Sequence, residues 1–161
     1  MNKRRFFSGF CIVLFACMLM LPCFSNDVKG EDWRLYFKGT DDVVFFYDSD
    51  SIHVEPNNVI QVLTKSKPGD EEGRMREITY RRNKGVNVPD DWSYTLDLWE
   101  INCKNKTSKI LSVISYNTNN EVIRSTVLSQ HPSLDFISPG TMMEYLYKAV
   151  CTRKGSKKKK R

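Results

Sequence analysis

The chain has 161 residues, of which 40% are hydrophobic and 27% charged, and its formal net charge is +6. That positive charge belongs to the two ends, because residues 26–151 carry 15 basic against 19 acidic residues, a net charge of −4. A chain of this length fits one domain. Its mildly acidic body argues against a folded nucleic-acid-binding surface, which needs clustered Lys and Arg on the domain itself.

The N-terminus has the layout of a secretory signal peptide. Three basic residues precede an apolar run over residues 6–24, and small residues lie before a cut after Ser25. We therefore expect a cleaved signal peptide at residues 1–25. Two alternatives stay open. Residues 14–17 resemble a lipobox, which would lipidate Cys17, and the apolar run is about long enough to act as an uncleaved membrane anchor.

Four segments of the mature chain are rich in aromatic or β-branched residues and end at turn residues, which predicts strands. These segments are residues 33–37, 43–47, 58–64 and 75–80. Residues 67–73 and 85–91 are predicted to be exposed loops, because they concentrate Gly, Pro and charged side chains.

The clearest β pattern runs over residues 92–116. Because side chains alternate along a strand, Leu96 and Leu98 face one side, whereas Trp99 and Ile101 face the other. Short turns then connect the last two predicted strands, which are residues 109–116 and 121–128. Such short connections predict an antiparallel meander.

The hydrophobic period changes near the C-terminus. Ser138 suits a helix N-cap, and Pro139 suits the first helical position, where its missing N–H costs nothing. Glu144 and Lys148 have the spacing of a helical ion pair. An apolar stripe recurs at three- and four-residue spacing and consists of Met142, Met143, Leu146, Ala149 and Val150. The pattern predicts an amphipathic helix that ends near Cys151, with the methionines as core filler rather than metal ligands.

Cleavage after Ser25 leaves two of the five cysteines, Cys103 and Cys151. In an oxidising compartment this even pair favours one structural disulfide, with two buried free thiols as the alternative. A bond between them places the predicted helix on the sheet face that carries Trp99 and Ile101. The sequence therefore predicts an α+β fold over residues 26–151: an antiparallel sheet of about six strands with a C-terminal helix packed on one face and tied by the disulfide.

Residues 152–161 form a basic tail, for which we expect a disordered end. Its hypothetical function is contact with anionic material such as acidic lipid, polysaccharide or nucleic acid. The candidate binding residues are Lys157, Lys158, Lys159, Lys160 and Arg161.

No catalytic motif stands out. The two histidines, His53 and His131, lie beside turns without a local partner, so each is interpreted as a solvated loop residue. Asp48 and Asp50 begin like a calcium loop, but Ile52 occupies a ligand position, which favours a plain turn. The sequence predicts no enzyme activity, no cofactor, no metal site and no small-molecule substrate.

The chain resembles the bacterial surface-adhesin protein E-like family. The matching positions are Trp33, Tyr47, Asp48, Ile52, residues 59–62, residues 100–103, Tyr116, residues 137–141, Val150 and Cys151. The resemblance implies an antiparallel sheet that carries a disulfide-linked C-terminal helix. It also implies surface display and binding of host extracellular proteins such as vitronectin and laminin.

From these features we expect an exported, non-enzymatic binding or adhesin-like protein, periplasmic, outer-membrane-associated or at the cell surface. It would contact a macromolecular partner through exposed loops, with 67–73 and 85–91 as candidates. The alternative is a structural or accessory envelope protein that acts by assembly with other proteins and has no ligand of its own.

Overall fold

The computed structural model describes residues 31–39, 42–128 and 134–152. The predicted signal peptide, His131 and the basic tail from Arg153 onward lie outside these residues. Eight strands make one sheet: β1 (Trp33–Lys38), β2 (Val43–Asp48), β3 (His53–Glu55), β4 (Val59–Pro68), β5 (Trp92–Asn102), β6 (Thr107–Asn117), β7 (Val122–Val127) and β8 (Asp135–Phe136). The helices within these residues are a 3-10 turn at Pro56–Asn58, α2 (Glu71–Asn83) and α3 (Met142–Cys151).

The main path of the sheet is an antiparallel meander in the order β1-β2-β4-β5-β6-β7, with β3 added beside β4 and β8 beside β6. The predicted α+β class and the six-stranded antiparallel arrangement are confirmed. The two additional strands have three and two residues, which is too short for an alternating pattern to be visible in the sequence.

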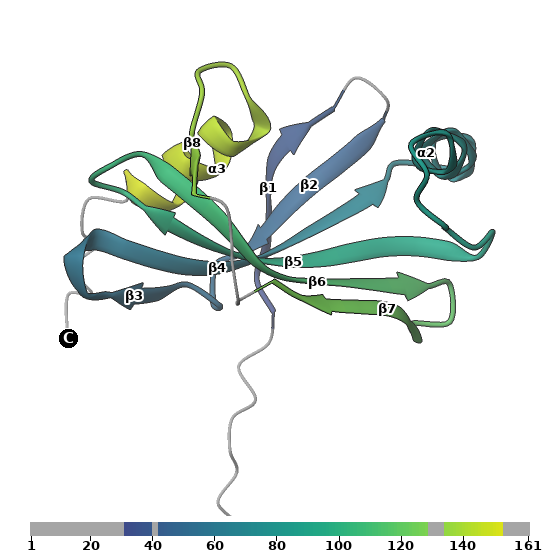
Figure 1. Cartoon of the computed structure of the whole chain (residues 1–161), viewed down its shortest axis with the longest axis horizontal. Coiled ribbons are helices and arrows are strands. Elements are labelled where there is room, and N and C mark those ends of the chain that lie inside the picture. Colours follow the sequence, from purple (N-terminus) through teal and green to yellow (C-terminus); the bar gives the residue numbers. More distant parts are fainter. Residues whose placement is uncertain (1–30, 40–41, 129–133, 153–161) are drawn as a thin grey trace, which may run out of the picture.

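Among the described residues, helices cover only one face of this sheet. Figure 1 shows α2 and α3 on the same side of the sheet, above its two ends. Along β4, Val62, Thr64 and Ser66 are buried, whereas the alternating neighbours Leu63 and Lys65 are only half-buried. We call the side of Val62 the covered face and the side of Leu63 the open face.

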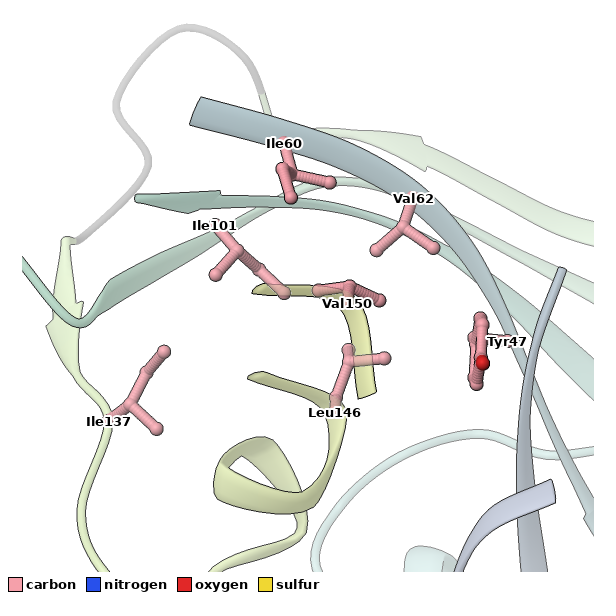
Figure 2. Packing of buried hydrophobic residues seen from close by; sticks show 7 residues of the cluster. All are labelled: Tyr47, Ile60, Val62, Ile101, Ile137, Leu146 and Val150. Atoms are coloured by element: carbon pink, nitrogen blue, oxygen red, sulfur yellow. The ribbon is translucent and has the colours of Figure 1, made fainter. Parts of the chain in front are cut away.

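Helix α3 closes one end of the covered face. Leu146 and Val150 point from α3 into a cluster with Ile60, Val62 and Ile101 (Figure 2). Trp99 packs against the same cluster. The predicted position of the helix on the face of Trp99 and Ile101 is therefore confirmed, as is the ion pair between Glu144 and Lys148, at 2.8 Å.

The predicted start of α3 is wrong by three residues. Thr141, rather than Ser138, is the N-cap, and its hydroxyl accepts a hydrogen bond from the Glu144 N–H at 3.3 Å. Gly140, which follows Pro139, has a φ of +76°. This left-handed conformation interrupts a right-handed helix, so the helix begins only after it.

The predicted strand at 75–80 and most of the predicted loop at 67–73 are also wrong. Strand β4 continues through Pro68, and residues 71–83 form helix α2. Asp70 caps this helix by accepting a hydrogen bond from the Gly73 N–H at 2.7 Å. Acids occupy its first turn and arginines its last, an arrangement that the helix dipole favours. Ile78 anchors it in a second cluster with Val88 and Trp92.

Candidate functional site

The open face is built from the side chains that alternate with the core positions. The strand registers place Leu35, Phe46, Lys65, Leu96 and Ile114 in one row across five strands. A second row runs through Leu63, Leu98, Ser112 and Val127. Because each strand contributes alternate residues to each face, both rows lie on the open face.

Aromatic side chains border these rows. The Tyr94 and Tyr116 rings stack with their centroids 4.7 Å apart. The Lys65 ammonium lies 4.0 Å from the Trp33 ring centroid and 5.3 Å from that of Tyr94. Burial lowers the pKa of Lys65; the charge of Lys67 adds to this effect, whereas the Glu31 carboxylate raises the pKa. The result is a cation held between two rings on a half-exposed apolar surface.

The exposed fractions of two side chains show how open this surface is. Val127 is 71% exposed and Leu35 is 57% exposed. Such an apolar surface performs no bond chemistry, but it offers contact area that a protein partner can cover. Sequence alternation separated Leu96 and Leu98 from Trp99 and Ile101, and the predicted disulfide placed α3 on the side of the latter pair. The sequence did not predict α2, the second helix on that side.

A hollow lies on the covered face at the end away from α3. It has a volume of about 660 Å³ and lies between the loop that follows α2 and strands β6 and β7. We call it the loop pocket. The predicted loop at 85–91 is confirmed as a loop, and it forms one wall of this pocket.

The structure joins Cys103 and Cys151 in the predicted disulfide, with their Cα atoms 5.6 Å apart. The bond connects the end of the β5–β6 hairpin to the last residue of α3. It lies against the Leu146 cluster and away from the open face. Its role in this arrangement is structural.

The residues weighed in the sequence as a catalytic base or as calcium ligands do not form a site in the described part of the chain. His53 is exposed, but it lies in β3 rather than in a loop, and its Nε2 lies 3.2 Å from the Glu55 carboxylate, so the prediction that it has no local partner is wrong. The Asp48 carboxylate accepts hydrogen bonds from the backbone N–H groups of Asp32 and Asp50, each at 3.0 Å, which confirms the turn interpretation. In the described ranges no three His, Cys, Asp or Glu side chains are grouped so that they could hold a metal ion.

One carboxylate in the covered face has a shifted pKa. Burial raises the pKa of Asp97 to about 6, and the nearby Arg81 opposes the shift. Burial, with a contribution from the Asp97 charge, also raises the pKa of Tyr36. The sequence did not single out either residue, because their burial depends on contacts between residues far apart in the chain.

The fold and these surfaces define a disulfide-linked α+β domain with one helix-covered and one open sheet face. The family model of surface-adhesin protein E matches residues 33–152, and the chain belongs to this family. No curated protein matches it. In the part of the chain that the structure describes, neither helix is long and apolar enough to cross a membrane.

Several solved structures are similar to this chain. Crystal form II of Haemophilus influenzae protein E has 13% sequence identity and a TM-score of 0.49, and the match covers 74% of this chain and 86% of that one. The selenomethionine form of the same protein has 14% identity and a TM-score of 0.49, covering 79% and 90%. Protein E from non-typeable Haemophilus influenzae has 12% identity and a TM-score of 0.42, covering 76% and 85%. The family assignment rests on the family model alone.

Proposed function

We propose that the protein is an exported, non-enzymatic, adhesin-like protein that binds a macromolecular partner through its open face. The observation that supports this most is an uncovered sheet face in a member of a surface-adhesin family. Exposed Leu35 and Val127 mark two sides of this face, and half-buried Phe46 and Leu96 lie between them.

The physical character of the face suits a protein partner. Aromatic side chains such as Trp33, Tyr94 and Tyr116 supply large contact areas at a small cost in side-chain entropy. The face is built on hydrogen-bonded strands, so it is rigid before binding, and little free energy is spent on ordering it. This assignment replaces residues 67–73 as the expected contact segment, because most of them belong to β4 and α2.

Export is part of the same proposal. A cleaved signal peptide at residues 1–25 would deliver the chain to an oxidising compartment, where the disulfide between Cys103 and Cys151 forms. The destination is the periplasm, the outer membrane or the cell surface. The basic tail, with Lys157–Lys160 and Arg161, would add attraction to an anionic surface.

A binding experiment with a matched pair of variants tests the proposal. The protein is purified after export, and its intact mass reports where the mature chain begins. Binding to immobilised matrix proteins, including vitronectin and laminin, is then measured for Val127→Glu and Val54→Glu. The two valines are 71% and 67% exposed, but Val54 pairs with Ile60 and lies on the covered face.

Val127→Glu should weaken binding at least fivefold, because it introduces a charge into an apolar contact, whereas Val54→Glu should leave binding unchanged. Equal affinities of both variants and the wild type would place the contact away from the open face. If neither the whole protein nor a form truncated after Thr152 binds, the adhesin function is wrong. A stable partner complex recovered from intact envelopes would then favour the accessory role.

A further inference from the structure

The loop pocket combines an apolar floor with polar side chains at its rim. Its volume, about 660 Å³, falls in the range of roughly 300–1,000 Å³ that is typical of small-molecule sites. Trp92 and Val88 are 1% and 5% exposed, so the floor is firmly packed. Val113 and Ile123 extend the apolar lining from β6 and β7.

A β-bulge directs Arg124 to this pocket. Ser115 pairs with Arg124 and Tyr116 pairs with Val122, so Ile123 is an extra residue in β7. A bulge of this kind changes the alternation of the strand, so that two consecutive side chains, Ile123 and Arg124, line the same hollow. Bulges often occur beside binding sites because they aim side chains in this way.

The side chain of Arg124 has no ion pair or hydrogen bond with another residue in the described part of the chain. Glu121, three residues before Arg124, and Asp91, which precedes β5, are engaged elsewhere. Asp91 and Glu121 both accept hydrogen bonds from the side-chain nitrogen of Asn117, at 3.2 and 2.9 Å. A guanidinium beside an apolar hollow, with its donors unused, is suited to an anion from outside the chain.

Arg81 lines the pocket from helix α2. Its Nε donates a hydrogen bond to Glu77 at 2.6 Å, and its guanidinium lies 4.4 Å from the Trp92 ring centroid. The two terminal nitrogens make no hydrogen bond within the described residues. Since Glu77 and Trp92 hold the guanidinium in place, it offers oriented donors at a small additional entropic cost.

We propose that the loop pocket binds a small amphiphilic anion: a compact apolar group that carries one carboxylate or sulfonate. The apolar group lies against Trp92, Val113 and Ile123. The anionic group accepts hydrogen bonds from Arg124, with Arg81 as the second donor. The site lies on the covered face, so this inference goes beyond the proposed adhesin function and is independent of it.

Two fluorescent probes with nearly the same ring systems test the role of charge. Anilinonaphthalene sulfonate carries the anion, whereas N-phenylnaphthylamine does not. Titrated into the protein purified after export, the sulfonate should occupy one saturable site. Arg124→Gln should weaken sulfonate binding at least tenfold and leave the affinity for the amine within twofold, because only the sulfonate uses the guanidinium.

A matched pair of substitutions tests the location. Thr126→Trp fills the pocket from β7 and should abolish saturable binding of both probes. Ser125→Trp places the same side chain one residue away, on the open face beside Ile114, and should leave binding unchanged.

Three results would each overturn the proposal. The first is an absence of saturable sulfonate binding, and the second is equal sulfonate affinity of Arg124→Gln and the wild type. The third is an equal effect of the two Trp variants. Arg124 is exposed on an edge strand, so its variant tests the proposal even if Thr126→Trp does not fold.

Discussion

At the residue scale, Asp97 makes the stability of the protein depend on pH in an unusual direction. It lies in β5 between Thr64 of β4 and Val113 of β6. Burial raises the pKa of its carboxyl to about 6, above the value of about 3.9 in an unfolded chain. Between these values the folded state binds more protons than the unfolded state. The free energy of unfolding therefore falls as the pH rises from about 4 to about 6.

Replacing Asp97 with Asn removes this titration. Asp97→Asn should raise the free energy of unfolding at neutral pH by up to about 2–3 kcal/mol, because two pKa units correspond to about 2.7 kcal/mol. At pH 4 the variant and the wild type should be nearly equal. Urea unfolding at several pH values measures the difference. Asp90→Asn, at a carboxylate whose side chain is 81% exposed, is the control and should keep the wild-type slope. If the free energy of unfolding depended on pH in the same way for Asp97→Asn and the wild type, the raised pKa of Asp97 would be contradicted.

At the element scale, helix α2 depends on one buried side chain. Ile78 is fully buried, and Gly73 is the other buried residue of the helix. Ile78→Ala should cost about 2–4 kcal/mol of unfolding free energy and should release α2 first, which amide hydrogen exchange can detect. Met75→Ala lies one turn away at a 45% exposed site and should cost less than about 0.5 kcal/mol. If Ile78→Ala lowered the free energy of unfolding no more than Met75→Ala, the polar contacts of α2 rather than Ile78 would hold the helix on the sheet.

The same helix shows where prediction from the sequence stops. The six strands of the main path and α3 were predictable, because apolar residues that alternate, or recur every three to four residues, indicate which side chains are buried. Residues 75–80 include Ile78, Thr79 and Tyr80, which are residue types common in strands. Because Ile78 is the one buried apolar side chain of α2, the helix has no row of apolar residues at three- and four-residue spacing. The available signal was electrostatic: Glu72 with Arg76 and Glu77 with Arg81 are ion pairs four residues apart. The loop pocket depends on where α2 and the loop after it lie over the sheet, which no local pattern encodes.

At the scale of the whole molecule, the two hydrophobic clusters lie at opposite ends of the covered face. One contains Leu146 of α3 and the other contains Trp92 beneath α2. Strands β4 and β5 cross both ends, since α2 contacts both strands and the Leu146 cluster contains Ile60 and Ile101. Continuous backbone pairing between the clusters favours cooperative unfolding of the domain as one unit.

The disulfide provides a test of that cooperativity. Its two cysteines are 48 residues apart, and closing a loop of this length stabilises a fold by about 4 kcal/mol, chiefly by restricting the unfolded chain. Cys103→Ala combined with Cys151→Ala should therefore lower the free energy of unfolding by about 3–4 kcal/mol. Reduced wild-type protein should show a similar loss.

Because the sheet joins both clusters, circular dichroism and tryptophan fluorescence should report the same shifted urea midpoint. A midpoint that shifts for one probe only would mean that α3 separates from a sheet that stays folded, and a loss below about 1 kcal/mol would show that packing alone holds α3 in place.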